Sequence, residues 1–296
     1  MKEKIAFIGF GKFGQSLASV LRQKDRYRIA AFDVADSGDE CQMPSAQEAL
    51  DGASYVFLVV PSSVFRSCVR ELPLPQVPLI SCTKGIDSES QKTPVEILHE
   101  LFPGHETAVL SGPMLSEELL EGLPAAGTIA SANITTAKKV KKLFKGTSVF
   151  LETSKDEIGV TWCGVLKNVY ALVLGLCDGL KLGDNFKSLL TRQALQEEGE
   201  IMKLVGGEKK SILTFAGVGD LLATGYCAKS RNYSYGYALG CGDPLPDVLA
   251  EGVKNIENVA TIAQGKKKLP LFDVTREIFV KDAPPRETLL AFHNKL

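Results

Sequence analysis

The sequence predicts an α/β fold in its first half and an all-helical domain in its second half. In the first half, short β-branched or aromatic runs alternate with segments of helical spacing, which is typical of a mainly parallel sheet with helices on both faces. Beyond about Thr153 the strand-like runs fade, and long apolar stretches of helical spacing continue toward the C-terminus. We therefore expect two domains, residues 1–153 and 154–296, and a length of 296 residues agrees with that number.

The expected strands are continuous apolar runs, as parallel strands buried on both faces should be. They cover residues 5–10, 28–33, 55–60, 79–81, 108–111, 127–130 and 149–151. The polar, Asp-rich segment 34–46 looks like a loop, too short for a full crossover helix. Residues 160–177 are apolar enough to raise the question of a membrane span. Lys167 and Asn168 lie at the middle of that stretch, which favours a buried helix in a soluble core.

Composition and charge exclude several classes of function. The chain has 34 Lys and Arg against 35 Asp and Glu, a net charge of −1, which argues against a nucleic-acid partner. Its seven cysteines are scattered, with no Cys-x-x-Cys pair, so we expect no metal site. Residues 1–4 run directly into an apolar strand and leave no room for a signal peptide, so we expect a cytoplasmic protein.

Three glycines, Gly9, Gly11 and Gly14, follow the first strand and open an amphipathic helix. In this context the first glycine makes a tight turn, the second lets the backbone approach a pyrophosphate, and the third lets helix and strand pack closely. The helix N-terminus offers free N–H groups to the phosphates. The motif predicts a doubly wound Rossmann domain. Asp33 ends the second strand, where a carboxylate accepts hydrogen bonds from the ribose hydroxyls. This predicts NAD as the cofactor, with NADP as an alternative. A simple turn residue is the other interpretation of Asp33.

Further short blocks, in chain order, resemble the NAD(P)-dependent glycerol-3-phosphate dehydrogenase family. They are Val59-Val-Pro61, Ser81-Cys-Thr-Lys-Gly85, Leu110-Ser-Gly-Pro113 with Glu117-Glu118, Gly164-Val-Leu-Lys-Asn168, Asp178-Gly-Leu-Lys-Leu-Gly183, Gly217-Val-Gly-Asp-Leu221, Ser230-Arg-Asn232 and Glu251-Gly252. The resemblance implies a Rossmann domain followed by a helical substrate domain. It also implies interconversion of dihydroxyacetone phosphate and sn-glycerol 3-phosphate in glycerophospholipid metabolism, and commonly a homodimer.

Lys167 is the candidate general acid/base. An unpaired ammonium in an otherwise apolar helix is costly to desolvate, and its pKa is expected to fall. The alternative from the residues alone is a lysine whose stem is buried and whose head reaches water. The resemblance assigns the catalytic role to Lys167. It also implies that Asp220 orients Lys167 and the substrate hydroxyls, and that Lys84 stands between substrate and nicotinamide; an N-cap is the alternative for Asp220.

A phosphorylated substrate needs several donors in fixed positions, and a guanidinium beside an amide, as in Arg231 and Asn232, can supply them. From the residues alone, a solvated turn is the alternative for this pair. The resemblance places the substrate phosphate on this pair, with the hydroxyl of Ser230 beside it. It further implies substrate contacts from Gly112 and Asn168. The remaining cofactor contacts that it implies, besides the three glycines and Asp33, are Lys12, Phe13, Pro61, Lys84, Ser116, Arg231 and Glu251.

The match departs from the family at three places, one of which is a C-terminus that ends soon after Pro284-Pro285. Met114 stands where the family usually presents Ser or Thr, and the connection from Asp33 to Tyr55 is short for the wall of an adenosine pocket. Two alternatives stay open for these reasons. One is a β-hydroxyacid dehydrogenase, although a carboxylate-binding enzyme would not need Lys84, Asp220 and the Arg231–Asn232 pair together. The other is a dinucleotide-binding paralogue without catalytic activity.

Overall fold

The computed structural model describes residues 2–263 and 268–295, and the chain divides into two compact units, Met1–Thr161 and Trp162–Leu296. The division falls inside helix α7 (Glu157–Gly179), whereas the sequence placed it before this helix, at residues 153/154. The first turn of α7 belongs to unit 1 because the Thr107 hydroxyl donates a 2.8 Å hydrogen bond to the buried Glu157 carboxylate.

Unit 1 contains a seven-stranded sheet in the order β2-β1-β3-β4-β5-β6-β7. Every neighbouring pair is parallel except β5 and β6, which are antiparallel. All seven predicted strands are present, which confirms the doubly wound α/β fold. Their bounds are β1 Glu3–Ile8, β2 Tyr27–Phe32, β3 Tyr55–Leu58, β4 Leu79–Ser81, β5 Thr107–Ser111, β6 Ala125–Ala130 and β7 Val149–Ser154.

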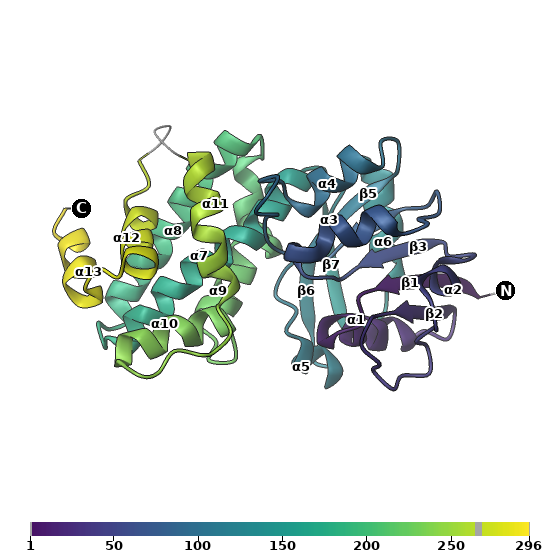
Figure 1. Cartoon of the computed structure of the whole chain (residues 1–296), viewed down its shortest axis with the longest axis horizontal. Helices are drawn as coiled ribbons and strands as arrows, with labels where there is room; N and C mark the ends of the chain where they lie inside the picture. The colour runs from purple at the N-terminus through teal and green to yellow at the C-terminus, as the bar shows by residue number, and fades with distance from the viewer. Residues whose placement is uncertain (1, 264–267, 296) are drawn as a thin grey trace. The chain divides into compact units, whose positions relative to one another are not determined.

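Helices cover both faces of this sheet (Figure 1). One face packs against α1 and α6 through residues such as Leu17 and Val140, and the other packs against α3 and α4 through residues such as Phe65 and Ile97. Each of these helices is amphipathic and turns its apolar stripe to the sheet. The helices of unit 1 are α1 Lys12–Arg22, α2 Ala46–Leu50, α3 Ser62–Glu71, α4 Pro94–Leu101, α5 Ser116–Leu120 and α6 Ile134–Leu143.

The connection after β2 is short, as expected. Residues 33–45 form neither a helix nor a strand, and the one-turn helix α2 follows them. Within this loop the backbone pairs with the outer edge of β2: the Ala31 N–H donates to the Cys41 carbonyl at 2.9 Å, and the Met43 N–H donates to the Ala31 carbonyl at 2.7 Å. The loop therefore covers the edge strand, which would otherwise present unpaired backbone groups.

Unit 2 is helical throughout its regular elements, as predicted. Besides α7, these are α8 Asp184–Val205, the 3₁₀ turn η1 Lys209–Leu213, the π turn η2 Phe215–Gly219, α9 Asp220–Gly225, α10 Arg231–Cys241, α11 Glu251–Ala263, α12 Pro270–Lys281 and α13 Pro285–His293. Among the described helices, α7 is the one long and apolar enough to cross a membrane by length and composition, and its apolar window is fully buried within the protein.

Glycines bring α10 against the backbone of α7. A Cβ atom on Gly236 would lie 1.9 Å from the Leu172 carbonyl oxygen, and one on Gly175 would lie 2.0 Å from the Tyr233 carbonyl oxygen. Gly179, four residues after Gly175, makes the same kind of approach to α10. Because neighbours four apart lie on one helix face, these glycines form a contact surface without side chains. That surface fixes the position of α10, whose first residues are the predicted phosphate ligands.

Candidate active site

The glycine-rich turn lies between β1 and α1, and two of its glycines are required by packing inside unit 1. Gly9 has φ of +91°, and a Cβ atom there would lie 2.5 Å from the Val59 carbonyl oxygen. A Cβ atom on Gly14 would lie 2.5 Å from the Gly9 carbonyl oxygen. Backbone oxygens cannot move away cheaply, so neither position accepts a side chain.

Gly11 differs from both. Its φ is −66°, which any residue can adopt, and a Cβ atom there would meet nothing within 4 Å. Gly11 is also the N-cap of α1, beside the free N–H groups of the first helical turn. The fold itself gives no reason for a glycine at this position. A bound pyrophosphate that needs close approach to the backbone does give one, so the turn fits a dinucleotide.

The Asp33 carboxylate ties the glycine-rich turn to the end of β2. One of its oxygens accepts the Phe10 N–H at 2.5 Å, and the other accepts the Ala35 N–H at 3.0 Å. The carboxylate thus has a structural role that the sequence did not reveal. Each carboxylate oxygen has a further lone pair for a ribose hydroxyl. The next residue, Val34, is 97% exposed and offers no cation for a 2′-phosphate.

The other predicted cofactor residues of unit 1 lie at carboxyl ends of strands or at starts of helices. Pro61 is the N-cap of α3, and Ser116 begins α5. Phe13 packs against the core, whereas the ammonium of Lys12 forms an exposed ion pair with Glu117 at 2.7 Å. This pairing of Lys12 was not predicted.

Lys84 follows β4, and its Nζ lies 3.5 Å from the carbonyl oxygen of Gly112, which follows β5. The sequence predicted roles for both residues, and the structure brings them together. Met114, which stands where a hydroxyl was expected, is buried in the core. Its Cε lies 3.2 Å from the place of a Cβ atom on Gly127, so the thioether occupies space that this glycine leaves.

In unit 2, the predicted pair of Lys167 and Asp220 is in direct contact. Lys167 Nζ lies 2.8 Å from Asp220 Oδ1 and donates a second hydrogen bond of 2.8 Å to Thr224 Oγ1. Lys167 lies on α7, and the other two residues lie one turn apart on α9. The exposed fractions are 8% for Lys167 and 3% for Asp220. Sequence analysis missed Thr224, although its spacing of four from Asp220 puts both on one helix face.

One premise of the sequence analysis was wrong: the ammonium of Lys167 is not unpaired. The helix is apolar along its own sequence, but α9 supplies a carboxylate and a hydroxyl from elsewhere in the chain. A charge this far from water is tolerated when it is paired and hydrogen-bonded. The pairing also fixes the direction of the amine.

The predicted substrate-binding amides form a chain from α7 to α11. Asn232 Nδ2 donates to Asn168 Oδ1 at 2.9 Å, and the Gly252 N–H donates to Asn232 Oδ1 at 2.8 Å. Both asparagines are buried. Glu251, a predicted cofactor residue, begins α11 next to Gly252. Asn232 is therefore held in place by neighbouring helices, with one N–H of its amide accounted for.

The remaining two predicted phosphate ligands begin α10. The Ser230 hydroxyl caps this helix by accepting the Tyr233 N–H at 3.3 Å. Arg231, the first residue of the helix, is exposed to solvent. The structure thus gives Ser230 a capping role and leaves the Arg231 guanidinium at the surface of unit 2.

Glu198 on α8 is a buried carboxyl group that sequence analysis missed. It has 0% exposure, and neither of its oxygens has a hydrogen-bond partner among residues 2–263 and 268–295. Burial raises the pKa of Glu198 to about 8, and the charge of Asp220 acts in the same direction. The adjacent Glu197, by contrast, accepts the N–H groups of Leu271 and Phe272 at the start of α12. Two adjacent glutamates on a helix give no sequence signal for this difference.

Two sequence models of one family match most of the chain. The model for the C-terminus of NAD-dependent glycerol-3-phosphate dehydrogenase matches residues 156–290, and the model for its N-terminus matches residues 40–137. The glycerol-3-phosphate dehydrogenase [NAD(P)+] of Synechococcus sp. strain JA-3-3Ab is 38% identical over 263 residues, which cover 88% of this chain and 83% of that protein. This chain belongs to the glycerol-3-phosphate dehydrogenase family.

Other family members support the same assignment over nearly the whole length. The glycerol-3-phosphate dehydrogenase [NAD(P)+] of Nostoc sp. strain PCC 7120 is 32% identical, over 96% of this chain and 94% of that protein. The crystal structure of glycerol-3-phosphate dehydrogenase from Coxiella burnetii matches with a TM-score of 0.90 and 27% identity, covering 99% of each chain. The family uses a nicotinamide dinucleotide, which confirms the predicted cofactor class.

Gly11→Ala should weaken cofactor binding without unfolding the protein, because the added methyl group meets only the space beside the helix N-terminus. We expect the Kd for reduced cofactor, measured by fluorescence titration, to rise at least about tenfold, or about 1.4 kcal/mol. Thermal unfolding should change little. Gly14→Ala is the matched control, and it should lower the unfolding temperature because its methyl group collides with the Gly9 carbonyl oxygen. An unchanged Kd in Gly11→Ala would contradict the assignment of the turn.

Glu198→Gln should stabilise the protein more at alkaline pH than at acid pH. The carboxyl group loses its proton near its ordinary pKa of about 4.5 in the unfolded chain, but only near 8 in the folded protein. Because the unfolded state binds fewer protons between these values, the parent loses stability as pH rises through this window. Denaturant unfolding near pH 6 and near pH 8.5 should show a relative gain for the glutamine variant on the order of 1–3 kcal/mol.

The matched control for this prediction is Glu200→Gln on the same helix, whose partly exposed carboxylate pairs with Lys203. The control variant should show no comparable gain with rising pH. If the free energies of unfolding of Glu198→Gln and the parent differ equally at both pH values, the Glu198 carboxyl group has a hydrogen-bond partner in solution and the prediction is wrong.

Proposed function

We propose that this chain interconverts dihydroxyacetone phosphate and sn-glycerol 3-phosphate with a nicotinamide cofactor. The observation that carries the proposal is the buried contact of Lys167 with Asp220 and Thr224, found in a chain of the glycerol-3-phosphate dehydrogenase family. In this proposal residues 1–153 bind the dinucleotide, and residues 154–296 bind the substrate and supply the acid/base group. The protein acts in the cytoplasm as a homodimer.

Lys167 is the general acid/base. In ketone reduction its ammonium gives a proton to the carbonyl oxygen as the carbon is reduced, and in the reverse direction the neutral amine takes the hydroxyl proton. When bound, the nicotinamide cofactor supplies or accepts the hydride. Asp220 and Thr224 each accept a hydrogen from Lys167 Nζ, which orients the amine.

The substrate phosphate is bound by Arg231 and Asn232. A guanidinium binds two phosphate oxygens at once, and the Asn232 amide has a second N–H beyond the one given to Asn168. Ser230 contributes at the start of the same helix, where free N–H groups favour an anion. Lys84, Gly112 and Asn168 complete the proposed substrate contacts.

The dinucleotide is bound by the glycine-rich turn and by groups near it. The open space beside Gly11 supports this placement, since the fold does not require a glycine there. The full set of proposed cofactor residues is Gly9, Gly11, Lys12, Phe13, Gly14, Asp33, Pro61, Lys84, Ser116, Arg231 and Glu251. The exposed Val34 next to Asp33 favours NAD over NADP, because a 2′-phosphate would meet a carboxylate without a neighbouring cation.

The two alternative functions are separable by substrate. The purified protein is incubated with NADH and, in parallel, with dihydroxyacetone phosphate, dihydroxyacetone and tartronate semialdehyde, and loss of reduced cofactor is followed by absorbance. The proposal expects turnover of the phosphorylated ketone alone at useful rates. Preference for tartronate semialdehyde would identify a β-hydroxyacid dehydrogenase. Cofactor binding without turnover of any substrate would identify a paralogue that has lost catalysis.

Lys167→Met should lower kcat at least about 100-fold, the lower end of general acid/base contributions, while cofactor binding to unit 1 stays unchanged. Methionine keeps the length and apolar packing of the stem but has no proton to give. Thr224→Val is a milder companion that removes one of the two groups holding the amine, and it should lower kcat less. Turnover by Lys167→Met within a few-fold of the parent would remove Lys167 from the mechanism.

Asp33→Ser should narrow the preference for NADH over NADPH, through KM more than kcat, because the change affects binding far from the reacting carbon. Serine keeps an acceptor for the Phe10 N–H that Asp33 holds, so the glycine-rich turn should persist. Steady-state kinetics with both cofactors measures the ratio of kcat/KM. If the parent itself uses the two cofactors equally, Asp33 serves only to hold the turn.

A further inference from the structure

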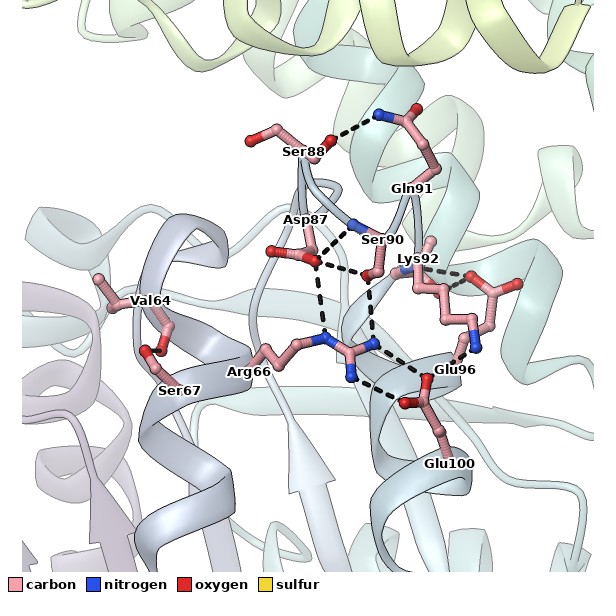
Figure 2. Close-up of polar contacts among 11 residues, drawn as sticks. Val64, Arg66, Ser67, Asp87, Ser88, Ser90, Gln91, Lys92, Glu96 and Glu100 are labelled. Atoms are coloured by element: carbon pink, nitrogen blue, oxygen red, sulfur yellow. Dashed lines mark hydrogen bonds and ion pairs between the residues drawn. The ribbon is translucent and has the colours of Figure 1, made fainter.

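A half-buried polar cluster outside the sites described above centres on Arg66 of α3 (Figure 2). Its guanidinium forms a two-point contact with the Glu100 carboxylate of α4, at 2.8 and 3.0 Å. The same group donates to Ser90 Oγ at 3.1 Å and lies 3.6 Å from Asp87 Oδ2. Arg66 thus joins two helices to the loop between β4 and α4. Lys92 adds a second cation beside Glu100, at 2.7 Å.

The part of the loop that Arg66 contacts is closed by its own hydrogen bonds. The Asp87 N–H donates to the Lys92 carbonyl at 2.9 Å, and the Gln91 N–H donates to the Asp87 carbonyl at 2.8 Å. The Ser90 N–H and hydroxyl both donate to Asp87 Oδ2, at 3.0 and 2.5 Å. Residues 87–92 therefore form one compact turn, and Arg66 contacts this turn at Asp87 and Ser90.

Lys84 stands only three residues before this turn. The two residues between, Gly85 and Ile86, are buried, and Gly85 has φ of +136°, so this short connection has little freedom. On the other side of Lys84, the Thr83 hydroxyl donates to the Val60 carbonyl at 2.7 Å. The backbone that carries Lys84 is consequently fixed at two points. The upstream point lies just beyond the carboxyl ends of β3 and β4, and the downstream point depends on Arg66.

We propose that Arg66 is a positioning residue for Lys84, acting through Asp87 and Ser90 to hold the loop that carries the lysine. This inference rests on the proposed function, in which Lys84 contacts substrate and nicotinamide. A guanidinium suits the task because its planar fork can bind the Glu100 carboxylate and still donate to the loop, which an ammonium cannot do with the same geometry. Without Arg66, the mostly buried Asp87 carboxylate would lose its neighbouring cation, and the turn would lose its link to α3.

The test is a double-mutant cycle on kcat/KM for dihydroxyacetone phosphate, with Arg66→Met in the parent and in a Lys84→Met background. In the parent we expect a loss of at least about tenfold, since misplacement of a binding group by about 1 Å can cost 100-fold. In the Lys84→Met background the same change should alter kcat/KM less than about twofold, because no ammonium remains to be misplaced.

Two further variants sharpen the test. Lys92→Met removes a cation from Glu100 without touching Asp87 or Ser90 and should leave kcat/KM unchanged. Asp87→Asn keeps an acceptor for the Ser90 N–H but weakens the link to Arg66, so it should reproduce the Arg66→Met effect in smaller measure even if Arg66→Met folds poorly. Equal losses in both backgrounds would show that Arg66 only stabilises the fold and would overturn this inference alone. A parent without activity on dihydroxyacetone phosphate would overturn both the inference and the proposed function.

Discussion

The buried ion pair between Lys167 and Asp220 is the constraint on which the arrangement of unit 2 depends. Removing two charges from water costs several kcal/mol, and the cost is recovered only when the geometry is good and the remaining hydrogen bonds are satisfied. That requirement fixes α9 against α7 at one register, since Asp220 and Thr224 must both reach a single ammonium group. The pair therefore imposes specificity on the packing of these helices and, in the proposed mechanism, orients the amine that acts as the acid/base group.

Helix α7 meets α10 and α11 partly through its backbone. Gly175 and Gly236 allow α7 and α10 to approach within backbone distance, and Gly252 brings the start of α11 equally close to the Asn168 carbonyl. The hydrogen bonds from Asn232 to Asn168 and from Gly252 to Asn232 then join the three helices. The side chains proposed to bind substrate from α7 and α10 are thus carried by helices in close contact, which favours fixed positions.

The fold was predictable from the sequence because its signals are local. Continuous apolar runs located all seven strands, and the glycine-rich turn located the start of α1. The contact of Lys167 with Asp220 was expected only through family resemblance, because the two residues lie 53 positions apart. The sequence did not predict the role of Thr224, the burial of Glu198 or the contact of Arg66 with residues 87–92. Each depends on which element, distant in sequence, packs against the residue. A local sequence pattern does not contain that information.

The buried ionisable groups of unit 2 differ in whether hydrogen bonds satisfy them, and the difference bears on the proposed catalysis. Lys167 and Asp220 are buried as a hydrogen-bonded ion pair, and Glu197 accepts several hydrogen bonds, although burial still raises its pKa. Glu198 has no hydrogen-bond partner in the part of the chain that the structure describes, and burial raises its pKa to about 8, which favours the neutral form at neutral pH. A charged Glu198 would place a second negative charge near Asp220. This charge would add to the negative electrostatic potential around the ammonium of Lys167. A neutral Glu198 leaves Asp220 as the carboxylate that pairs with Lys167, the acid/base group of the proposed mechanism.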